Sequence, residues 1–563
     1  LVASIFQPII RFYSIYDNKM LKIFCFLLLF SIVIKGDIEP SDGLRENSPS
    51  VWALTGGIVH IKPGLKLEDA TIIIRDGLIE NVGSDVTIPK DATVLDMSGK
   101  TIYPGFIDSW VEIPTGSEDI LDHDAHWNFK IHARRELSHL YKPETKKITE
   151  MHKLGFTAAH IVPDSGIFQG QTALVQLDNR GTILKAGIAQ KIAYEVDGWG
   201  SKKYPNALLG VVALIRQTFI DANWYKKASE KARLYPQLNE PLQRNRDLEI
   251  LGHWLTQNKP FIIETNHELT ALRSFNIAEE FKISYWIKGS GYEYRRIHEI
   301  KNQKPFIILP LDFPFTPDIS DPYQELNYST AELKHWDMAP DNPAILSDNG
   351  IHFAFTAHGL VGKEFRKNLN RSVKRSLFES DALAALTTTP AEMMEMENQL
   401  GKIEKGYLAN LTISEGNYFH SKSEIVSTWI GGEEYFVMPK YDTSVIGQWR
   451  LTIENKLYQL ELQKKKGSYS GKIIQDTTEY KLSKLKVGGR FISWQVKWDS
   501  TSAVSRFTGH ILANSMEGTA HDMQVSWDAL KIGTLVKEEK KKEPEYRSEL
   551  SVFYPEGTYG LED

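Results

Sequence analysis

The first patterned region of the chain begins near residue 51 and predicts short β-strands. A glycine-kinked apolar run at 53–61 is followed by a β-branched run at 70–74. The Asp-Gly pair at 76–77 separates this run from the next apolar segment. Because glycine takes a positive φ at little cost, such a pair between apolar runs predicts a β-hairpin. We therefore expect a small sheet between residues 50 and 108.

The pattern changes after this sheet, and short apolar strands alternate with longer helical segments as far as about residue 400. Helical periodicity predicts helices at 208–225 and 269–281. The strands predicted here are 158–163, 260–264, 284–287, 305–310 and 352–356. Alternation of strands and helices is typical of an α/β architecture with parallel strands, and a closed (β/α)8 barrel is the leading case.

Strands return in the last third of the chain. Two apolar runs, at 408–413 and 425–430, precede a region at 441–535 whose runs alternate like antiparallel strands. This texture predicts a separate all-β module. The last segment, 536–563, contains a dense run of lysine and glutamate and is interpreted as a charged linker and tail.

Composition agrees with a folded protein and narrows the classes of partner. Apolar residues make up 42% of the chain and charged residues 25%, so disorder and coiled coil do not describe the whole chain. The net charge is 66 − 72 = −6. Without a basic excess, the sequence does not indicate nucleic acid or an anionic membrane as a partner.

The first 36 residues resemble a processing segment rather than part of the fold. Met20 begins a short basic start, an apolar run follows at 23–34, and the exit is polar. This pattern predicts a signal peptide. Residues 1–19 are then upstream read-through, and the protein is expected to be exported, periplasmic or secreted. The alternative is an uncleaved anchor, which would be the only contact with a membrane.

The single cysteine of the chain, Cys25, lies inside that predicted signal peptide. The mature protein would then have no cysteine. It could form no disulfide, use no thiolate nucleophile and hold no metal through sulfur.

Three blocks of sequence together resemble the amidohydrolase superfamily, in particular its imidazolonepropionase-like branch. The blocks are 70–108, which ends in Pro-Gly-Phe-Ile-Asp, then 381–391 and 400–411. The resemblance extends over about residues 50–440. It implies a TIM-like (β/α)8 barrel at 104–400 inserted in a small β-sandwich, whose two parts are 50–108 and 401–440. It also implies hydrolysis of carbon–nitrogen bonds, in cyclic amides or in peptides, by zinc-dependent relatives.

The chain departs from this family where the metal ligands belong. Active relatives have His-x-His after the first block, and this chain has Trp110 and Glu112 there. Glu264 replaces the histidine of the fifth strand, and Ala357, followed by His358, replaces the aspartate of the last strand. No ligand can be assigned in the fourth strand. We therefore expect no metal or other cofactor in this barrel, and assign no catalytic residue.

The residues expected around this vestigial site are Trp110, Glu112, Glu264, His267, Ala357 and His358. A carboxylate that stays charged in such a place needs a hydrogen-bonding or cationic partner. Arg216 and Lys288 are the candidate partners.

Three functions remain open from the sequence. Further segments, such as 166–171, resemble long exported proteins with two barrel halves in tandem, of which only the second keeps the metal motif. The chain would then be a silent first half that supports an active second barrel, either fused or co-encoded. The alternatives are an active hydrolase with a rearranged site and a non-enzymatic protein that binds a small ligand or glycan. The sequence does not indicate an oligomeric state.

Overall fold

The computed structural model describes residues 51–116, 123–196, 202–237, 242–317, 327–437 and 445–533, the last range with gaps at 455, 466–467, 477, 489–490, 499–503 and 513–514. The predicted leader at 1–36 and the charged tail at 536–563 lie outside these residues. None of the described helices is both long and apolar enough to cross a membrane.

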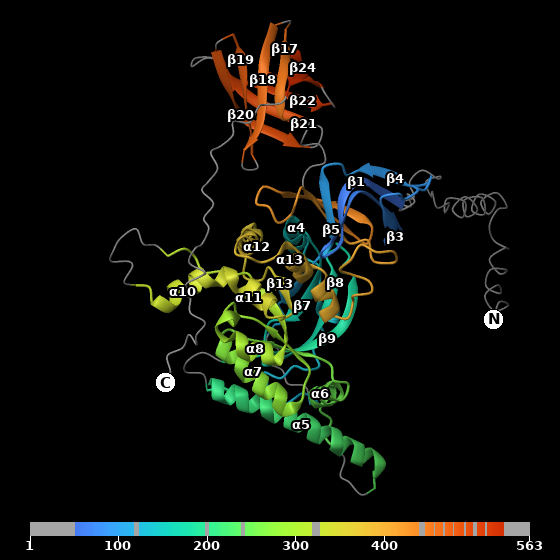
Figure 1. Cartoon of the computed structure of the whole chain (residues 1–563), viewed down its shortest axis with the longest axis vertical. Coiled ribbons are helices and arrows are strands. Elements are labelled where there is room, and N and C mark those ends of the chain that lie inside the picture. Colours follow the sequence, from blue (N-terminus) through green and yellow to red (C-terminus); the bar gives the residue numbers. More distant parts are fainter. Residues whose placement is uncertain are drawn as a thin grey trace, which may run out of the picture. The chain divides into compact units, whose positions relative to one another are not determined.

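The first sheet takes strands from two distant parts of the chain (Figure 1). Its strands are β1 (Val51–Lys62), β2 (Leu65–Arg75), β3 (Leu78–Gly83), β4 (Thr93–Asp96), β5 (Lys100–Pro104), β14 (Leu411–Glu415), β15 (Glu424–Ile430) and β16 (Glu433–Phe436). The order is β16-β15-β14-β5-β1-β2-β3, with β4 beside β1. Instead of two stacked sheets, these strands form one continuous sheet around a shared apolar core.

The hairpin predicted between β2 and β3 is confirmed. Asp76 and Gly77 both have positive φ, 51° and 79°. This is the combination that a two-residue turn needs if it is to follow the twist of its strands. A side chain at Gly77 would also collide with the backbone of Gly431, since a Cβ there would lie 2.8 Å from that carbonyl oxygen.

The second sheet has eight strands and is nearly closed. Its strands are β6 (Phe106–Ile113), β7 (Phe156–Pro163), β8 (Phe168–Gln176), β9 (Ile183–Ala193), β10 (Phe261–Glu264), β11 (Tyr285–Lys288), β12 (Phe306–Pro310) and β13 (Phe353–Thr356). They follow one another in chain order across the sheet. At the seam, the Thr356 hydroxyl of β13 donates to the Trp110 carbonyl of β6, at 2.9 Å.

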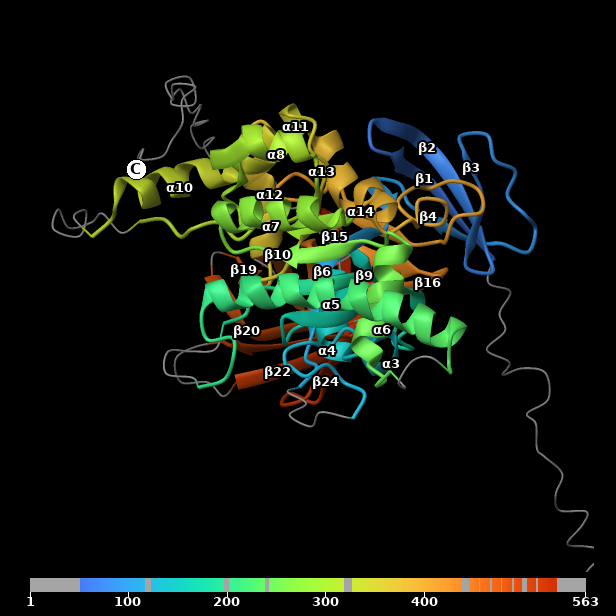
Figure 2. The same cartoon turned by 90° about the horizontal axis from the view of Figure 1, so that it is seen from below.

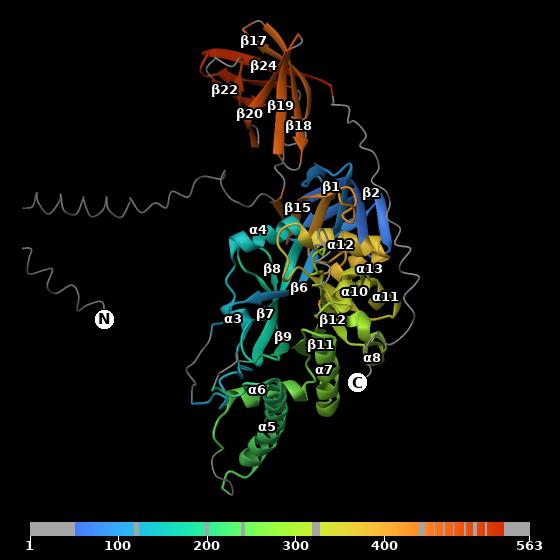
Figure 3. The ribbon, with the colours of Figure 1, turned by 90° about the vertical axis from the view of Figure 1, so that its left-hand side faces the viewer.

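This barrel-like sheet differs from the expected (β/α)8 pattern in one strand. Strand β8 runs antiparallel to both β7 and β9, and the described connections on either side of it contain no helix. Seven strands therefore share one direction and one opposes them. Figure 3 shows β6 to β9 beside one another on one side of the sheet.

The helices of this region fall mostly between the parallel strands. They are α3 (Leu137–Leu140), α4 (Thr145–Leu154), α5 (Leu208–Leu234), α6 (Arg246–Thr256), α7 (Glu268–Phe281), α8 (Ile297–Gln303), α10 (Thr330–Met338), α11 (Asn342–Asp348), α12 (Glu364–Lys374), α13 (Glu379–Leu386) and α14 (Thr388–Met393). The helices predicted at 208–225 and 269–281 are confirmed as α5 and α7. Helix α12 contacts both α11 and α13, and these helices lie together in Figure 2.

The region from 445 to 533 is all-β, as predicted, and forms a closed antiparallel barrel. Its strands are β17 (Gly447–Ile453), β18 (Lys456–Lys465), β19 (Ser468–Gln475), β20 (Thr478–Gly488), β21 (Phe491–Lys497), β22 (Val504–Ile511), β23 (Ser515–Ala520) and β24 (Val525–Gly533). Strand β17 pairs with β24 and closes it. Aromatic side chains, with Trp494 stacked on Phe507 at 5.2 Å between ring centroids, fill the interior.

Candidate functional site

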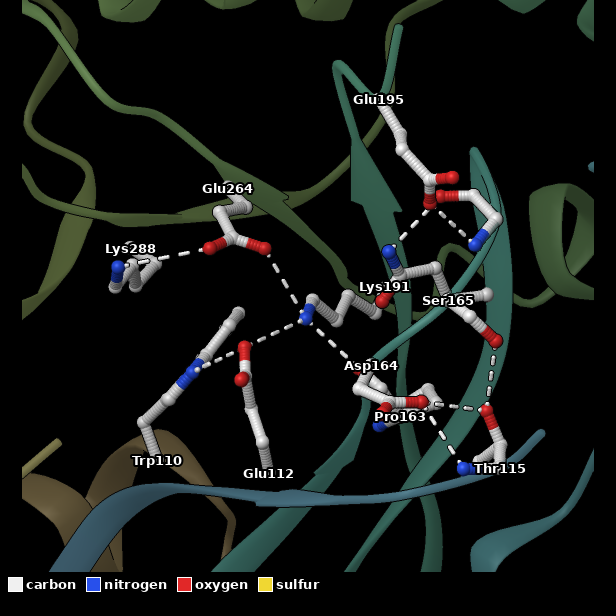
Figure 4. A network of polar contacts seen from close by, with 12 residues as sticks. Trp110, Glu112, Thr115, Pro163, Asp164, Ser165, Lys191, Glu195, Glu264 and Lys288 are labelled. Atoms are coloured by element: carbon white, nitrogen blue, oxygen red, sulfur yellow. Dashed lines mark hydrogen bonds and ion pairs between the residues drawn. The ribbon is translucent and has the colours of Figure 1, made fainter. Parts of the chain in front are cut away.

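Four charged side chains meet at the carboxyl ends of β6, β9, β10 and β11 (Figure 4). The Lys191 ammonium lies between two carboxylates, 3.3 Å from Glu112 Oε1 and 3.1 Å from Glu264 Oε2. Lys288 Nζ approaches the other oxygen of Glu264 at 3.5 Å. Parallel barrel strands end at one face, and that face is where such folds carry their sites. We call these four residues the lysine cluster.

Trp110 forms one side of the lysine cluster. Its indole N–H donates to Glu112 Oε1 at 3.3 Å, and its ring centroid lies 4.4 Å from Lys191 Nζ and 5.7 Å from Lys288 Nζ. The ring is fully buried. An ammonium over an indole face is held by the negative face of the ring. Trp110 therefore offers no metal ligand and instead stabilises two cations.

Burial makes the partners of Lys191 energetically necessary. Only 1% of its side chain is exposed, and an unpaired buried ammonium costs several kcal/mol. Besides the two carboxylates, the Pro163 carbonyl accepts a hydrogen bond from Lys191 at 2.7 Å. Burial acts to raise the pKa of Glu264, but the charges of Lys191 and Lys288 outweigh it and hold that pKa below its usual value. Two cations thus face two anions, and the cluster balances its own charge.

His358 joins the edge of the lysine cluster. Its ring centroid lies 6.5 Å from that of Trp110. Burial lowers the pKa of His358 and the nearby lysines lower it further, whereas Glu112 and Glu264 act in the opposite direction. The net shift is downward, so the imidazole is neutral at pH 7.

The side chain of Asp108, in β6, contacts the backbone of Ala357, the residue that follows β13. The Asp108 carboxylate accepts from the backbone N–H groups of Trp110, at 3.0 Å, and Ala357, at 3.2 Å. Burial raises the pKa of Asp108 to about 6, although these hydrogen bonds act against the rise. The Asp108 side chain thus connects the two edge strands of the sheet, because it binds one backbone N–H in β6 and one directly after β13.

The structure brings together most of the residues singled out in the sequence. Trp110, Glu112, Glu264 and His358 meet at the lysine cluster, whereas the backbone N–H of Ala357 contacts Asp108. His267 does not join them, because it caps the N-terminus of α7 and its Nδ1 lies 3.0 Å from Glu268 Oε2.

Of the two cations proposed as partners for the carboxylates, one lies at the site. Lys288 contacts Glu264. Arg216, in contrast, lies on α5 and donates to Glu280 at 2.7 Å.

The central residue, Lys191, was missed in the sequence because β8 and β9 were not predicted. All nine residues of β8 are buried, but its glutamines and threonine break any apolar period. Lys191 lies in the fourth strand of the sheet, where no ligand could be assigned. A usable signal was present: a lysine inside the run Ile188–Tyr194 needs a partner if the strand is buried.

These residues do not fit the zinc centre that the family resemblance implies. Among the described residues, no group of three or more His, Cys, Asp and Glu side chains is placed to share a metal ion. The two carboxylates that could contribute are already bound to an ammonium, which would repel a divalent cation. The carboxylates and lysines neutralise one another at the place where the family resemblance implies zinc ligands.

Comparisons with known proteins place these observations in a family context. Residues 295–436 match the family model described as amidohydrolase family. The comparison with curated proteins gives no match. Among solved structures, an amidohydrolase from Thermotoga maritima MSB8 has a TM-score of 0.56 and 22% identity, covering 68% of this chain and 99% of its own. That likeness supports a TIM-like barrel combined with a β domain.

Other similar structures have lower scores. A β-aspartyl dipeptidase from Fervidobacterium islandicum AW-1 has a TM-score of 0.38 and 13% identity, covering 69% of this chain and 96% of its own. A Xaa-Pro dipeptidase has a TM-score of 0.41 and 14% identity, covering 69% of this chain and 100% of its own.

Proposed function

We propose that this chain provides a catalytically silent amidohydrolase-like barrel, of the imidazolonepropionase-like branch, that supports an active partner barrel. The observation that carries the proposal is the ammonium of Lys191 between Glu112 and Glu264. The family match at 295–436 supports the amidohydrolase part of the proposal.

Silence follows from what hydrolysis of an amide needs. In a metal-dependent hydrolase, the metal lowers the pKa of a bound water so that hydroxide is available at neutral pH. In this barrel, the two carboxylates are paired with lysines, and the Trp110 ring packs against both ammonium groups. An ammonium polarises a water far less than a divalent ion does, because it carries half the charge and has no open coordination position.

One observation favours the alternative of a rearranged hydrolase site. The neutral imidazole of His358 lies near two carboxylates, as a general base would. A silent barrel and a rearranged hydrolase predict different metal contents and different turnover, so one set of measurements separates these two functions.

The first experiment measures zinc in the purified chain after dialysis against trace zinc, together with hydrolysis of a β-aspartyl dipeptide and a Xaa-Pro dipeptide. A silent barrel should retain less than about a tenth of an equivalent, because a site with three or four protein ligands binds zinc firmly. It should also show no turnover above the level of the Glu264→Gln variant. About one equivalent of zinc that disappears in Glu264→Gln, or turnover lost in His358→Ala, would overturn the proposal.

The partner part of the proposal has its own test. We propose that the active barrel is fused or co-encoded and that both are exported, as the predicted signal peptide suggests. Expression of that second barrel alone and together with this chain should give higher hydrolase activity or yield in the joint sample. Equal activity and equal yield in the two samples would contradict a supporting role.

A further inference from the structure

The outer face of α5 carries a group of exposed apolar side chains. Leu209 is 81% exposed, Trp224 58% and Ile220 51%, and Ala213 between them is also exposed. Scattered apolar residues are ordinary on a protein surface, but a contiguous group marks an interaction site. The group that we call the α5 stripe consists of these four residues and of the two at its middle, Arg216 and Gln217.

All six members of the α5 stripe lie on one side of the helix. With 3.6 residues per turn, their positions fall within an arc of about 100°. The buried residues of α5 are centred on the opposite side, where Phe219 packs on Phe168 of β8 and Phe261 of β10, with 5.3 Å between ring centroids in each case. The stripe therefore faces away from the sheet β6–β13, and Figure 3 shows α5 on the outside of this region, next to α6.

The α5 stripe has the same apolar spacing in both directions along the helix. Ala213 and Ile220 lie equally far from its midpoint at 216–217, and so do Leu209 and Trp224. Turning the helix end over end about that midpoint exchanges the two members of each pair. A contact between two copies related by a two-fold axis needs this property, because one surface must be complementary to itself. An unrelated partner would place no such condition on the spacing.

We propose that the α5 stripe is the interface between two copies of this chain, with their α5 helices antiparallel. In this arrangement, Leu209 of one copy packs on Trp224 of the other, and Ala213 packs on Ile220. The small side chain of Ala213 lets the two helices approach closely near the centre, and the larger pair covers each end. None of these residues belongs to the lysine cluster, so the proposal does not depend on whether the barrel is silent.

The one charged member of the α5 stripe favours the antiparallel arrangement. Arg216 of one copy lies opposite Gln217 of the other, one helical turn from Asp221 there. Within each copy, Gln217 Nε2 already donates to Asp221 Oδ1 at 2.6 Å, so the carboxylate is held at this place. Parallel helices would instead place Arg216 against Arg216, and like charges that face each other across an interface are repelled. The antiparallel interface is therefore complementary in charge as well as in shape.

The length of the α5 stripe sets the strength of the expected dimer. From Leu209 to Trp224 the helix rises by about 22 Å. A helix pair in contact over this length buries on the order of 1,000 Å² in total, which is the lower end of specific protein interfaces. We therefore expect a dimer that dissociates at micromolar concentrations.

Sedimentation velocity of the full chain between about 1 and 200 µM tests the proposal. The wild type should shift from monomer to dimer as its concentration rises. Ile220→Lys and Ala213→Glu should each weaken association at least about tenfold, because each places an unpaired charge against an apolar side chain. The double variant should associate at least about threefold more tightly than either single one, because the new lysine of one copy faces the new glutamate of the other. The two positions are two turns apart within one helix, so they do not pair there.

Phe378→Glu is the matched control, because Phe378 is 67% exposed and lies outside α5. It should dimerise as the wild type does, and circular dichroism should show every variant folded, since all the altered positions are exposed. A chain that stays monomeric over the whole range would overturn the proposal. So would a dimer that persists in Ile220→Lys, or that weakens equally in Phe378→Glu. A double variant no tighter than the single ones would contradict the antiparallel pairing.

Discussion

Two of the eight-stranded structures in the described part of the chain, the closed barrel β17–β24 and the nearly closed sheet β6–β13, hold very different interiors. The closed antiparallel barrel β17–β24 is filled with apolar side chains such as Trp449, Trp494 and Phe507. The nearly closed sheet β6–β13 keeps Lys191 buried between two carboxylates, and it buries Asp108 against backbone N–H groups. Packing alone explains the first interior. Buried ion pairs are rarely a net source of stability. Stability therefore does not explain the charged residues inside the sheet β6–β13, which is consistent with a functional site there.

The largest expected effect belongs to the apolar interior. Replacement of Trp494 by alanine should destabilise the antiparallel barrel by about 3–5 kcal/mol, because a fully buried indole leaves both lost contacts and a cavity. Differential scanning calorimetry of the full chain measures this as a lower transition temperature. Phe491→Ala is the control, since Phe491 is 62% exposed on the same barrel and should cost less than about 1 kcal/mol. Similar losses for the two variants would contradict a packed interior.

The next largest effect should appear in the way the stabilities of the sheet β6–β13 and the barrel β17–β24 depend on pH. Burial raises the pKa of Asp108 from 3.8 to about 6 in the folded state. A raised carboxyl pKa means that its stability contribution is present below the unfolded pKa and is lost as pH rises toward the folded one. The difference corresponds to about 3 kcal/mol. Between pH 4 and 6, the nearly closed sheet should lose this stability.

Asp108→Asn provides the readout for that prediction. Burial also raises the pKa of Asp341 to about 6, so wild type will lose stability with pH for more than one reason. The quantity to compare is therefore the slope of the free energy of unfolding against pH, in wild type and in Asp108→Asn. The antiparallel barrel has only Ser505 as a buried polar residue among its described residues. Its calorimetric transition should therefore move little across this range. An unchanged slope in Asp108→Asn would show that this carboxyl does not titrate on folding.

Lys191 should give a somewhat smaller effect. Lys191→Met leaves Glu112 and Glu264 facing each other without their shared cation, and we expect a loss of about 2–3 kcal/mol, since both carboxylates keep some solvent contact. The quadruple variant that adds Glu112→Leu, Glu264→Met and Lys288→Met should recover to within about 1 kcal/mol of wild type, because no unpaired charge of the cluster remains. Urea unfolding measures both. A quadruple variant as unstable as Lys191→Met would show instead that the cluster is a net source of stability.

Much of the architecture could be predicted from the sequence, but the centre of the site could not. The strand ending in Glu264 and the strand preceding His358 were predicted correctly, because their apolar runs are short and bounded by turns. Strand β9 was missed because the polar residues Gln190 and Lys191 interrupt its apolar pattern. The side-chain partners of Lys191 come from β6, β7 and β10, so no local pattern reveals them. The carboxylates were therefore found without the cation between them.

The smallest effects should rank the three cations by burial and number of contacts. Lys288 has 14% of its side chain exposed and one carboxylate partner, at 3.5 Å, so Lys288→Met should cost about 1 kcal/mol. Arg216 forms an exposed pair with Glu280 on the helix surface, and Arg216→Met should cost less than about 0.5 kcal/mol. Urea unfolding at 0.05 M and 0.5 M salt separates them further, because screening weakens only the exposed pair. If Arg216→Met cost as much as Lys191→Met, burial would not be what distinguishes the lysine cluster from an ordinary surface ion pair.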